Sequence, residues 1–438
     1  MHLILMPLLV AGNVLLMQDP APRTLDKRID PSRITEASPP PLPEEIAQPV
    51  PARHRLAANA AQVPIKEAYF DEGRVALQRA LTWLASQQAP DGSWMNKAKS
   101  ATTAEPTKAE PITVAVTALA VKALVQAGDT GEAYQKGLDY LLEATGSADG
   151  FALGTEGRLG TYVAASVCSA LASIDDPIVV DRLQSSVEWL KNAQWDDAEG
   201  LQPTQDWYGG AGYGNRGRPD LSNTQMMLDA LHDAGVSPDD PTVQRALLFV
   251  SRAQNLKATN QAEWAQNGSN DGGFVYTCAN GGESMGSEYA GEGRYGELLD
   301  AEQARSLRSY GSMTYAGFKS MLYAGLTQDD IRVRAAYDWV KRHWTFAENP
   351  GLGQQGRYYY LHALSRALVA AQQPRITTPD GVEHSWREEL IETLLEDQKT
   401  NGSWANSAPR WLEDEPVLAT IYASLAIEEA LKPAAGEQ

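Results

Sequence analysis

A repeated unit of two helices joined by a glycine turn runs through the sequence from Arg74 onward. The first and last copies show it most clearly, because segments 88–94 (QAPDGSW) and 398–404 (QKTNGSW) carry Gln, Gly and Trp at the same offsets. A single helix pair cannot bury both of its faces, so units of this kind stack on one another. The repeat therefore predicts one stacked helical array in place of several independent domains.

Six such units follow one another along the chain. The expected second helices span residues 113–127, 161–171, 221–234, 312–324, 358–371 and 418–431. They are apolar nearly all round, as 114–121 (VAVTALAV) illustrates, which is typical of helices that are covered on every side. We expect them to form an inner ring inside the amphipathic first helices. Because six pairs can close on themselves, we predict an all-α (α/α)6 toroid, a double ring of about twelve helices.

The first 64 residues differ from the repeats. Residues 3–17 (LILMPLLVAGNVLLM) form an apolar run that has the length of a signal-peptide core and is too short to span a bilayer comfortably. Residues 18–64 are rich in Pro, Ala and charge, which predicts a flexible, disordered linker. We therefore expect a signal segment at 1–17, a linker at 18–64 and the toroid at 65–438. Such a protein is exported to the periplasm or the cell exterior, either cleaved or tethered by its N-terminal segment.

Charge and cysteine content narrow the choice of partners. The net charge of -19 argues against nucleic acid, because a phosphate backbone rewards clustered Lys and Arg. Neither Cys168 nor Cys278 belongs to a CxxC pair, so zinc-finger and thioredoxin-like sites are excluded. Two buried thiols and one disulfide both fit the sequence. A protein partner and contact with a membrane surface stay open.

The turns of the repeat resemble those of a known superfamily. The Gln-x3-Gly-x-Trp pattern looks like the QW motif of squalene and oxidosqualene cyclases, and the DGGF turn at 271–274 is similar to one in protein-prenyltransferase β-subunits. The chain is thereby identified as a prenyltransferase and squalene-oxidase/cyclase repeat protein of the terpenoid cyclase and protein prenyltransferase superfamily. The resemblance implies that Trp94 and Trp404 stack on Gln88 and Gln398 and hold outer helices together, which is a structural role.

The superfamily's active site lies in a central funnel, at the N-terminal ends of the inner helices, where cyclases carry the acid motif Asp-x-Asp-Asp-Thr. The matching stretch here is residues 220–224 (DLSNT). Asp220 matches the first acid and is our candidate catalytic residue, whereas Ser222 stands at the proton-donating position and Asn223 replaces the third acid. A Ser hydroxyl is too weak an acid to protonate an alkene. Asp, Ser and Asn are also preferred N-caps, so this stretch can equally serve as a helix cap alone.

Aromatic and polar side chains gather where the loops meet the inner helices. The predicted substrate-binding residues are Trp207, Tyr213, Ser222, Asn223, Tyr310, Tyr315, Tyr359 and His362. In cyclases such rings line an apolar cavity and stabilise carbocations, although packing of the inner ring explains them equally well. A prenyltransferase zinc site needs Asp, Cys and His on neighbouring inner helices. Only His362 is in place, so we expect no metal and no cofactor.

These observations predict an exported, squalene-cyclase- or prenyltransferase-like toroid that binds an apolar, isoprenoid-type ligand in its central funnel. Whether it catalyses a reaction stays open; an enzyme of this kind would be an isoprenoid cyclase or transferase. The alternative is a secreted, non-catalytic scaffold or protein-interaction toroid that lost the acid motif. A glycosidase that uses two carboxylates across the funnel, drawn from Glu110, Asp220 and Glu415, is a further alternative.

Overall fold

The computed structural model describes residues 66–95, 111–147, 150–151, 159–214, 217–284 and 307–432. The predicted signal segment at 1–17 and linker at 18–64 lie outside these residues, so both stay predictions, as does the export that rests on them. Within the described residues the chain is mostly helical.

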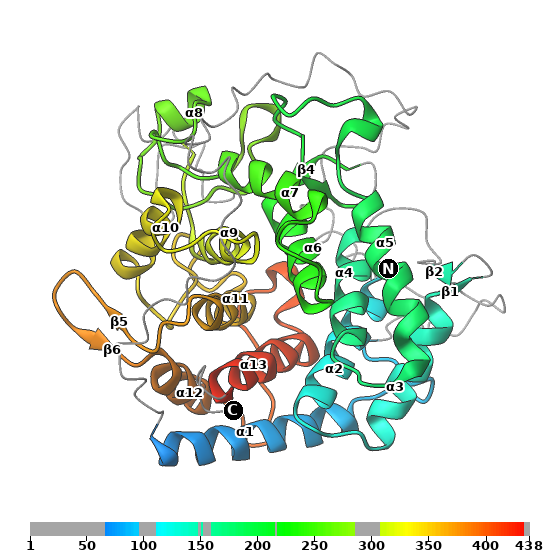
Figure 1. Ribbon diagram of the computed structural model, residues 1–438. Coiled ribbons are helices and arrows are strands. Elements are labelled where there is room, and N and C mark those ends of the chain that lie inside the picture. Colours follow the sequence, from blue (N-terminus) through cyan, green and yellow to red (C-terminus); the bar gives the residue numbers. More distant parts are fainter. Residues whose placement is uncertain are drawn as a thin grey trace, which may run out of the picture.

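An inner ring of helices forms the centre of the molecule. Its members are α2 (Pro111–Gln126), α4 (Gly160–Leu171), α6 (Leu221–Asp233), α9 (Gly311–Tyr323), α11 (Arg357–Ala370) and α13 (Pro416–Leu431). Each helix contacts the next in this order, and α13 returns to contact α2. The inner ring is therefore closed (Figure 1).

An outer layer covers this ring. Its members are α1 (Glu67–Ser86), α3 (Glu132–Ala144), α5 (Val180–Asn192), α7 (Pro241–Arg252), α10 (Ile331–Arg342) and α12 (Trp386–Asp397). Each of them contacts at least one inner helix, and α1 also contacts α12, so the first and last units lie side by side (Figure 1). The predicted α/α toroid is confirmed.

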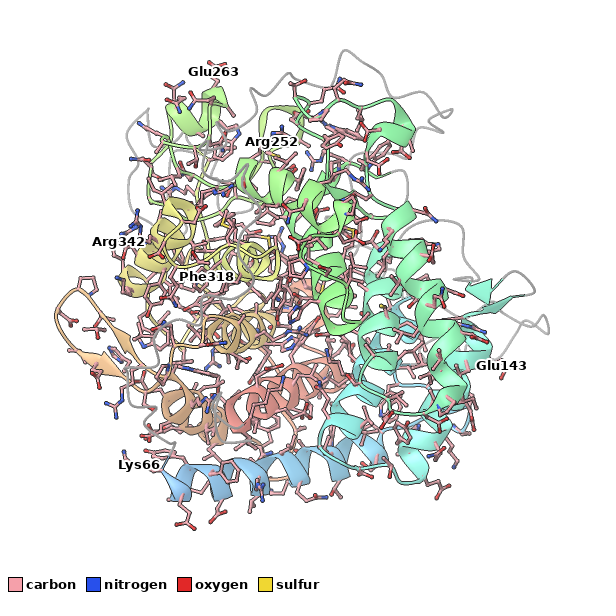
Figure 2. All side chains as sticks on the ribbon, viewed as in Figure 1. Lys66, Glu143, Arg252, Glu263, Phe318 and Arg342 are labelled. Carbon is pink, nitrogen blue, oxygen red and sulfur yellow. The ribbon has the colours of Figure 1, made fainter. Side chains whose placement is uncertain are left out.

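Apolar patterning explains which helices lie inside. In α2 almost every residue from Thr113 to Leu124 is buried, whereas α7 buries Val243, Ala246, Leu247 and Val250 on one stripe, as an amphipathic helix does. Side chains fill the space between the two rings (Figure 2). For example, Phe318 of α9 stacks on Tyr337 of α10, with ring centroids 5.8 Å apart.

One hydrogen-bond motif, here called the Gln–Gly clasp, joins successive units at four turns of the described chain. In each clasp a Gln side-chain amide donates to the carbonyl of the turn glycine and to a carbonyl of the next outer helix, at 2.8–3.0 Å. The clasps are Gln88 to Gly92 and Ala133, Gln194 to Gly209 and Thr242, Gln254 to Gly272 and Arg332, and Gln398 to Gly402 and Ala76. The last clasp ties the final unit to α1.

The clasp glycines cannot be replaced without strain. All four have a left-handed φ, between 83° and 94°, which favours glycine. Each also lies directly on the backbone of the next outer helix; a Cβ on Gly209 would be 1.9 Å from the Arg245 carbonyl oxygen. The turn chemistry thus fixes the distance between neighbouring units.

The two repeat tryptophans connect the outer layer to the inner ring. The indole N–H groups of Trp94 and Trp404 donate to the carbonyls of Leu84 and Leu394, both at 2.8 Å. Their backbone N–H groups donate at 3.0 Å to threonine hydroxyls of the inner helices α2 and α13. These hydrogen bonds to backbone and threonine oxygens connect the outer helices to the inner ring. The stacking on Gln88 and Gln398 that the resemblance implies stays a prediction.

Short hairpins complete the described chain. They pair β1 (Gly146–Ser147) with β2 (Gly150–Phe151), β3 (Ala211–Gly212) with β4 (Pro219–Asp220), and β5 (Ile376–Thr377) with β6 (Glu383–His384), all antiparallel. A one-turn helix, α8 (Glu263–Gln266), lies in the long connection after α7. Strands of two residues are too short to produce an alternating pattern, so the sequence contains no signal for them. The β3–β4 hairpin places Asp220 directly ahead of α6.

Candidate functional site

Asp220 is the N-cap of α6. Its Oδ1 accepts the backbone N–H of Asn223 at 2.8 Å, and its Oδ2 accepts the Asn223 side-chain amide at the same distance. The carboxyl group is 1% exposed, so it is cut off from bulk water. The cap role that the sequence left open is therefore realised in the structure.

The environment of Asp220 favours its protonated form. Burial raises the pKa of this carboxyl from 3.8 to about 7, against the opposing effect of the Asn223 hydrogen bonds, the nearby Arg218 charge and a hydrogen bond from Tyr276. A carboxyl group in this range is part protonated near neutral pH, as a general acid or base must be. Because the Asp220 carboxyl group is buried, however, it does not directly contact the solvent-accessible interior.

Hydroxyl groups extend from Asp220 into the ring interior. The Tyr276 and Tyr213 hydroxyls lie 3.1 Å apart, and a hydrogen bond to Tyr162 also lowers the pKa of Tyr213, which burial raises overall. The Tyr162 hydroxyl in turn lies 2.5 Å from the Ser222 Oγ. Tyr162 of α4 and Tyr213, between β3 and β4, are both partly exposed. We call Asp220, Ser222, Tyr162, Tyr213 and Tyr276 the rim layer, because they lie at the N-terminal ends of α4 and α6.

A second set of polar contacts lies one to two helical turns below the rim layer, towards the C-terminal ends of the inner helices. The Gln225 amide of α6 donates to the Tyr359 hydroxyl of α11 at 2.9 Å. The Lys319 ammonium of α9 donates to the Gln225 Oε1 at 3.0 Å and to the Asp229 Oδ2 at 2.6 Å. Since α6 and α11 are separated in the ring by α9, the Gln225–Tyr359 bond crosses the interior. A side-chain hydrogen bond therefore spans part of the ring interior at this level.

Charged side chains close the ring at the C-terminal ends of its helices. Asp233, the last residue of α6, accepts from Lys122 of α2 at 2.8 Å and from Arg366 of α11 at 2.7 Å. The Ser169 hydroxyl of α4 also donates to it. Burial raises the pKa of Asp233, but Arg366 and Lys122 outweigh burial and hold it well below its usual range. We call Asp233, Lys122 and Arg366, together with Lys319 and Asp229, the charged floor.

Two further side chains face the interior between the rim layer and the floor. Tyr422 of α13 packs its ring against those of Tyr359 and His362, with centroids 5.8 Å away in both cases. All three are partly exposed. Burial, together with the nearby Arg366 and Lys319 charges, lowers the pKa of His362 well below its usual value, so its imidazole is neutral.

Polar groups from neighbouring loops cap other inner helices. The Glu413 carboxylate, 1% exposed, accepts the backbone N–H groups of Tyr358 at 3.2 Å and Tyr359 at 2.8 Å, at the start of α11. Burial raises its pKa, as it does for Asp220. The Asn349 Oδ1 accepts the backbone N–H of Ser312 in α9 at 2.9 Å. The helix N-termini at this end of the ring are thus satisfied by side chains.

The structure brings most of the predicted site residues together. Asp220, Ser222 and Asn223 begin α6, with Tyr213 beside them, while Tyr310 is the buried N-cap of α9 and Tyr359 and His362 follow one another down α11. Burial raises the pKa of Tyr310, and the ionisable groups of Tyr359, Asp220 and Tyr213 raise it further, so Tyr310 lies in the same neighbourhood. The functional role of these residues stays a prediction.

Two predicted residues lie elsewhere. Trp207 belongs to a small separate cluster with Trp195 and Leu201, and its indole N–H donates to Asn280 at 2.9 Å. Tyr315 is fully buried against Tyr360, between α9 and α11, with ring centroids 5.5 Å apart.

Several members of the site have no recognisable signal in the sequence. Tyr162 and Tyr422 are single tyrosines in apolar helices, where a ring that faces the interior looks like any core residue. Tyr276 and Glu413 lie in loops, and the path of these loops depends on the neighbouring units and not on a local sequence pattern. Of the carboxylates considered for a glycosidase, Glu415 is the N-cap residue of α13 and Glu110 lies outside the described residues.

The part of the chain that the structure describes contains neither a cluster of metal ligands nor a reactive thiol. There, no group of three or more His, Cys, Asp or Glu side chains is placed to hold a metal ion, and no helix is long and apolar enough to cross a membrane. Cys168 and Cys278 are both buried and free. Burial raises the pKa of the Cys168 thiol to about 12, which leaves it unreactive.

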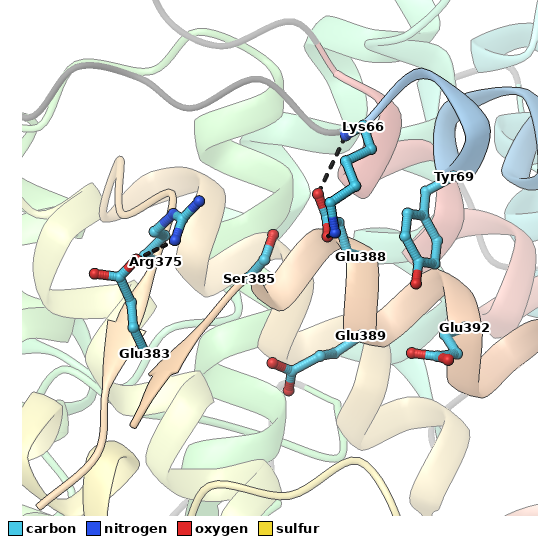
Figure 3. A pocket seen from close by; sticks show the side chains of 8 residues that line it. All are labelled: Lys66, Tyr69, Arg375, Glu383, Ser385, Glu388, Glu389 and Glu392. Carbon is cyan, nitrogen blue, oxygen red and sulfur yellow. Dashed lines mark hydrogen bonds and ion pairs between the residues drawn. The ribbon is translucent and has the colours of Figure 1, made fainter. Parts of the chain in front are cut away.

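One surface pocket of about 310 Å³ opens beside α1, α12 and the β5–β6 hairpin (Figure 3). Its lining residues are Lys66, Tyr69, Arg375, Glu383, Ser385, Glu388, Glu389 and Glu392. The Lys66 ammonium is paired with Glu388 at 2.9 Å, and Arg375 pairs with Glu383. The pocket lies outside the rings and shares no residue with the rim layer or the charged floor.

Comparison with known proteins supports the fold. A family model described as the squalene-hopene cyclase C-terminal domain matches residues 59–153. The chain resembles that family, as the repeat predicted. No curated protein matches the chain.

Solved structures of similar shape include two family 76 glycoside hydrolases. The α-1,6-mannanase of Salegentibacter sp. HEL1_6 has a TM-score of 0.50 at 12% identity, over 82% of this chain and 98% of its own. The enzyme from a bovine Bacteroides thetaiotaomicron strain has a TM-score of 0.51 at 10% identity, over 83% and 78%. The type II terpene cyclase MstE from Scytonema, at 14% identity, covers 83% of this chain and 98% of its own with a TM-score of 0.30. The family 76 enzymes establish the α/α toroid and nothing about the ligand.

Proposed function

We propose that the inner ring binds an apolar small molecule of isoprenoid type between its rim layer and its charged floor. The observation that carries this proposal is the set of partly exposed aromatic rings on inner helices, namely Tyr162, Tyr359 and Tyr422. The Tyr162 hydroxyl is bonded to Ser222 and the Tyr359 hydroxyl to Gln225, so the faces of these rings are what a ligand meets. Aromatic faces bury apolar groups well and attract cations.

Binding has better support than a cyclase-type protonation. Asp220 accepts two hydrogen bonds from Asn223 and has almost no exposed surface, so a proton could reach a ligand only through Tyr276 and Tyr213. Ser222, at the position of the family's acid, offers only a hydroxyl. A binding protein that kept the fold without the acid motif fits these contacts.

Glycoside hydrolysis, the activity of the family 76 enzymes, has less support. It needs two carboxylates that can reach a sugar ring from opposite sides. Asp220 and Glu413, the buried carboxylates at this end of the ring, both already accept backbone N–H groups as helix caps. We therefore favour the apolar ligand.

The proposal is tested with the full chain, by lipid extraction with mass spectrometry and by titration with farnesol. The variant Ser222→Trp places a bulky side chain in the interior, and Gln184→Trp makes the same change on the exposed side of α5. We expect an isoprenoid to co-purify with the protein, and farnesol to bind both wild type and Gln184→Trp. Ser222→Trp should bind at least about tenfold more weakly. Equal binding by a folded Ser222→Trp variant would place the ligand outside the ring.

Export of the protein is also part of the proposal. It rests on the apolar run at residues 3–17. Fractionation of expressing cells, with N-terminal sequencing of the product, tests it. Recovery of the intact chain from the cytoplasm alone would contradict export and would leave the ligand proposal unaffected.

A further inference from the structure

The surface pocket beside α1 and α12 lies where the first and last units of the ring meet. The helix α1 belongs to the first unit and α12 to the last, and the two helices contact each other. Lys66 lines the pocket, immediately precedes α1 and is the first residue that the structure describes. The chain that leads into the toroid therefore arrives at the edge of this pocket.

The lining of the pocket carries an excess of negative charge. Four of its residues are glutamates, whereas two, Lys66 and Arg375, are cations. Each cation is already paired with a glutamate of the pocket. Within the described residues, the carboxylates of Glu389 and Glu392 are left without a lysine or arginine partner.

These two carboxylates differ in how firmly they are held. The Glu389 Oε1 lies 2.9 Å from the His384 Nδ1, and its Oε2 accepts the indole N–H of Trp344 at 3.2 Å. Glu392 is exposed and makes no hydrogen bond or ion pair with any residue that the structure describes. Figure 3 shows Tyr69 reaching from α1 towards α12, beside both carboxylates. A guanidinium group suits such a pocket, because it pairs with carboxylates through two parallel bonds and stacks on aromatic rings.

The sequence just ahead of the toroid has the opposite charge. Residues 46–65 contain Arg53, His54 and Arg55 and no Asp or Glu, although the whole chain has a net charge of -19. Ten residues separate Arg55 from Lys66. A coil of that length has a root-mean-square span of roughly 15–20 Å. This span is enough to bring the arginines back across a pocket of about 310 Å³.

We propose that the pocket beside α1 and α12 is the docking site of the chain's own basic segment, Arg53–Arg55. One guanidinium group pairs with the free carboxylate of Glu392, and the other pairs with Glu389. The docked segment then lies across the seam at which the first and last units close the ring. This inference is independent of the ligand proposed for the ring interior.

Covalent attachment decides whether so small a contact forms. An exposed ion pair by itself favours association only about two- to fivefold. A short linker, however, holds the arginines near the pocket at an effective concentration in the millimolar range or above. We therefore expect comparable populations of the docked and free forms at low salt. Because both pairs are exposed, salt should shift this balance towards the free form.

Limited proteolysis of the full chain with trypsin tests the proposal. Trypsin cuts after Arg53 and Arg55 in the free form, and its cut after Arg33 is the internal reference. Relative to that reference, we expect both cuts to be about twofold slower at low salt than at about 0.5 M salt. Glu392→Arg should remove this protection. Glu396→Arg, at an exposed glutamate one turn further along α12 and outside the pocket, should keep it. Equal cleavage of the two variants overturns the inference.

Oxidative cross-linking locates the contact. His54→Cys with Ser385→Cys places one thiol in the segment and one in the pocket, and keeps both arginines and all four glutamates. His54→Cys with Ser86→Cys is the control, because Ser86 is exposed at the far end of α1. The two native cysteines are buried. We expect the pocket pair to close at least about threefold faster than the control, and Glu392→Arg to remove the difference. Equal rates, or cross-linking between two chains in place of one, would contradict docking of the chain on itself.

Discussion

At the scale of single residues, burial decides how Asp220 behaves. Three donors, the Asn223 backbone, the Asn223 amide and Tyr276, favour its ionised form, yet loss of water favours the protonated form more strongly. The same carboxyl in an exposed N-cap would stay ionised at neutral pH. Asp220 is the last residue of β4, and its burial there brings its pKa to about 7.

This balance predicts a specific pH dependence of stability. Because the folded-state pKa of about 7 lies above the value of 3.8 for an exposed Asp, the folded state holds the proton more tightly than the unfolded state. The resulting stability is complete below pH 3.8 and is lost as the pH rises towards 7. Relative to the Asp220→Asn variant, which cannot titrate, the wild type should lose about 1.4 kcal/mol per pH unit between pH 5 and 7. Urea unfolding at several pH values measures this, and parallel curves for the two proteins would show that the pKa is not raised.

A second residue-scale prediction concerns the clasps. Gln254 is fully buried and supplies the donor for the carbonyls of Gly272 and Arg332. The change Gln254→Met keeps the length of the side chain and leaves both carbonyls without this donor, so we expect a loss of about 2–4 kcal/mol of unfolding free energy. Gln184→Met, on the exposed side of α5, is the control and should change little. Equal stability of the two variants would show that the clasp contributes nothing.

At the scale of elements, the turns set how closely neighbouring units approach. Gly209 has a φ of 85° and lies on the carbonyl of Arg245, whereas Gly200 has a φ of 78° with open space around it. The two glycines therefore need the same backbone conformation but differ in their surroundings. Comparing them separates the cost of a left-handed φ from the cost of close approach.

The corresponding substitutions should differ clearly. Gly200→Ala is expected to cost about 1 kcal/mol, which is the strain of a left-handed alanine. Gly209→Ala adds a clash with backbone atoms at 1.9 Å, so its cost should exceed that of Gly200→Ala by about 2–3 kcal/mol. Thermal and urea unfolding of both variants test this. Similar costs would mean that α7 can move away from the turn freely.

At the scale of the whole molecule, the charged floor holds together inner helices that are not neighbours in the ring. Asp233 connects α6 to α2 and α11, neither of which is its neighbour in the ring. The floor thus braces the ring across its centre.

Removing the central acid should destabilise the entire domain. Asp233→Ala leaves Lys122 and Arg366 buried without this counter-charge, which we expect to cost about 3–5 kcal/mol. Glu132→Ala removes the exposed partner of Lys136 and should have no measurable effect. Calorimetry distinguishes the outcomes: one transition shifted to lower temperature fits a brace across a single core, while a variant as stable as wild type contradicts it.

The repeat itself determined the architecture. The Gln, Gly and Trp spacing at 88–94 and 398–404 and the alternation of amphipathic and apolar helices are local properties, and local patterning is enough to say which helix lies inside. Helix boundaries followed for the same reason: α6 was expected at 221–234 and spans Leu221–Asp233. Asp220 as the cap of α6 was also readable, because an N-cap acts on residues only three positions away.

Only the tertiary structure decided which side chains meet inside the ring. Gln225 and Tyr359 are 134 positions apart in the sequence, and Asp233 and Arg366 are 133 positions apart. Both contacts depend on how whole helices are rotated within the ring. Trp207 packs in a separate cluster and Tyr315 against Tyr360 for this reason, while Glu413 reaches the start of α11 from the loop ahead of α13. Periodicity fixes which face of a helix is apolar, but the identity of the facing side chain follows only from closure of the ring, which no local pattern encodes.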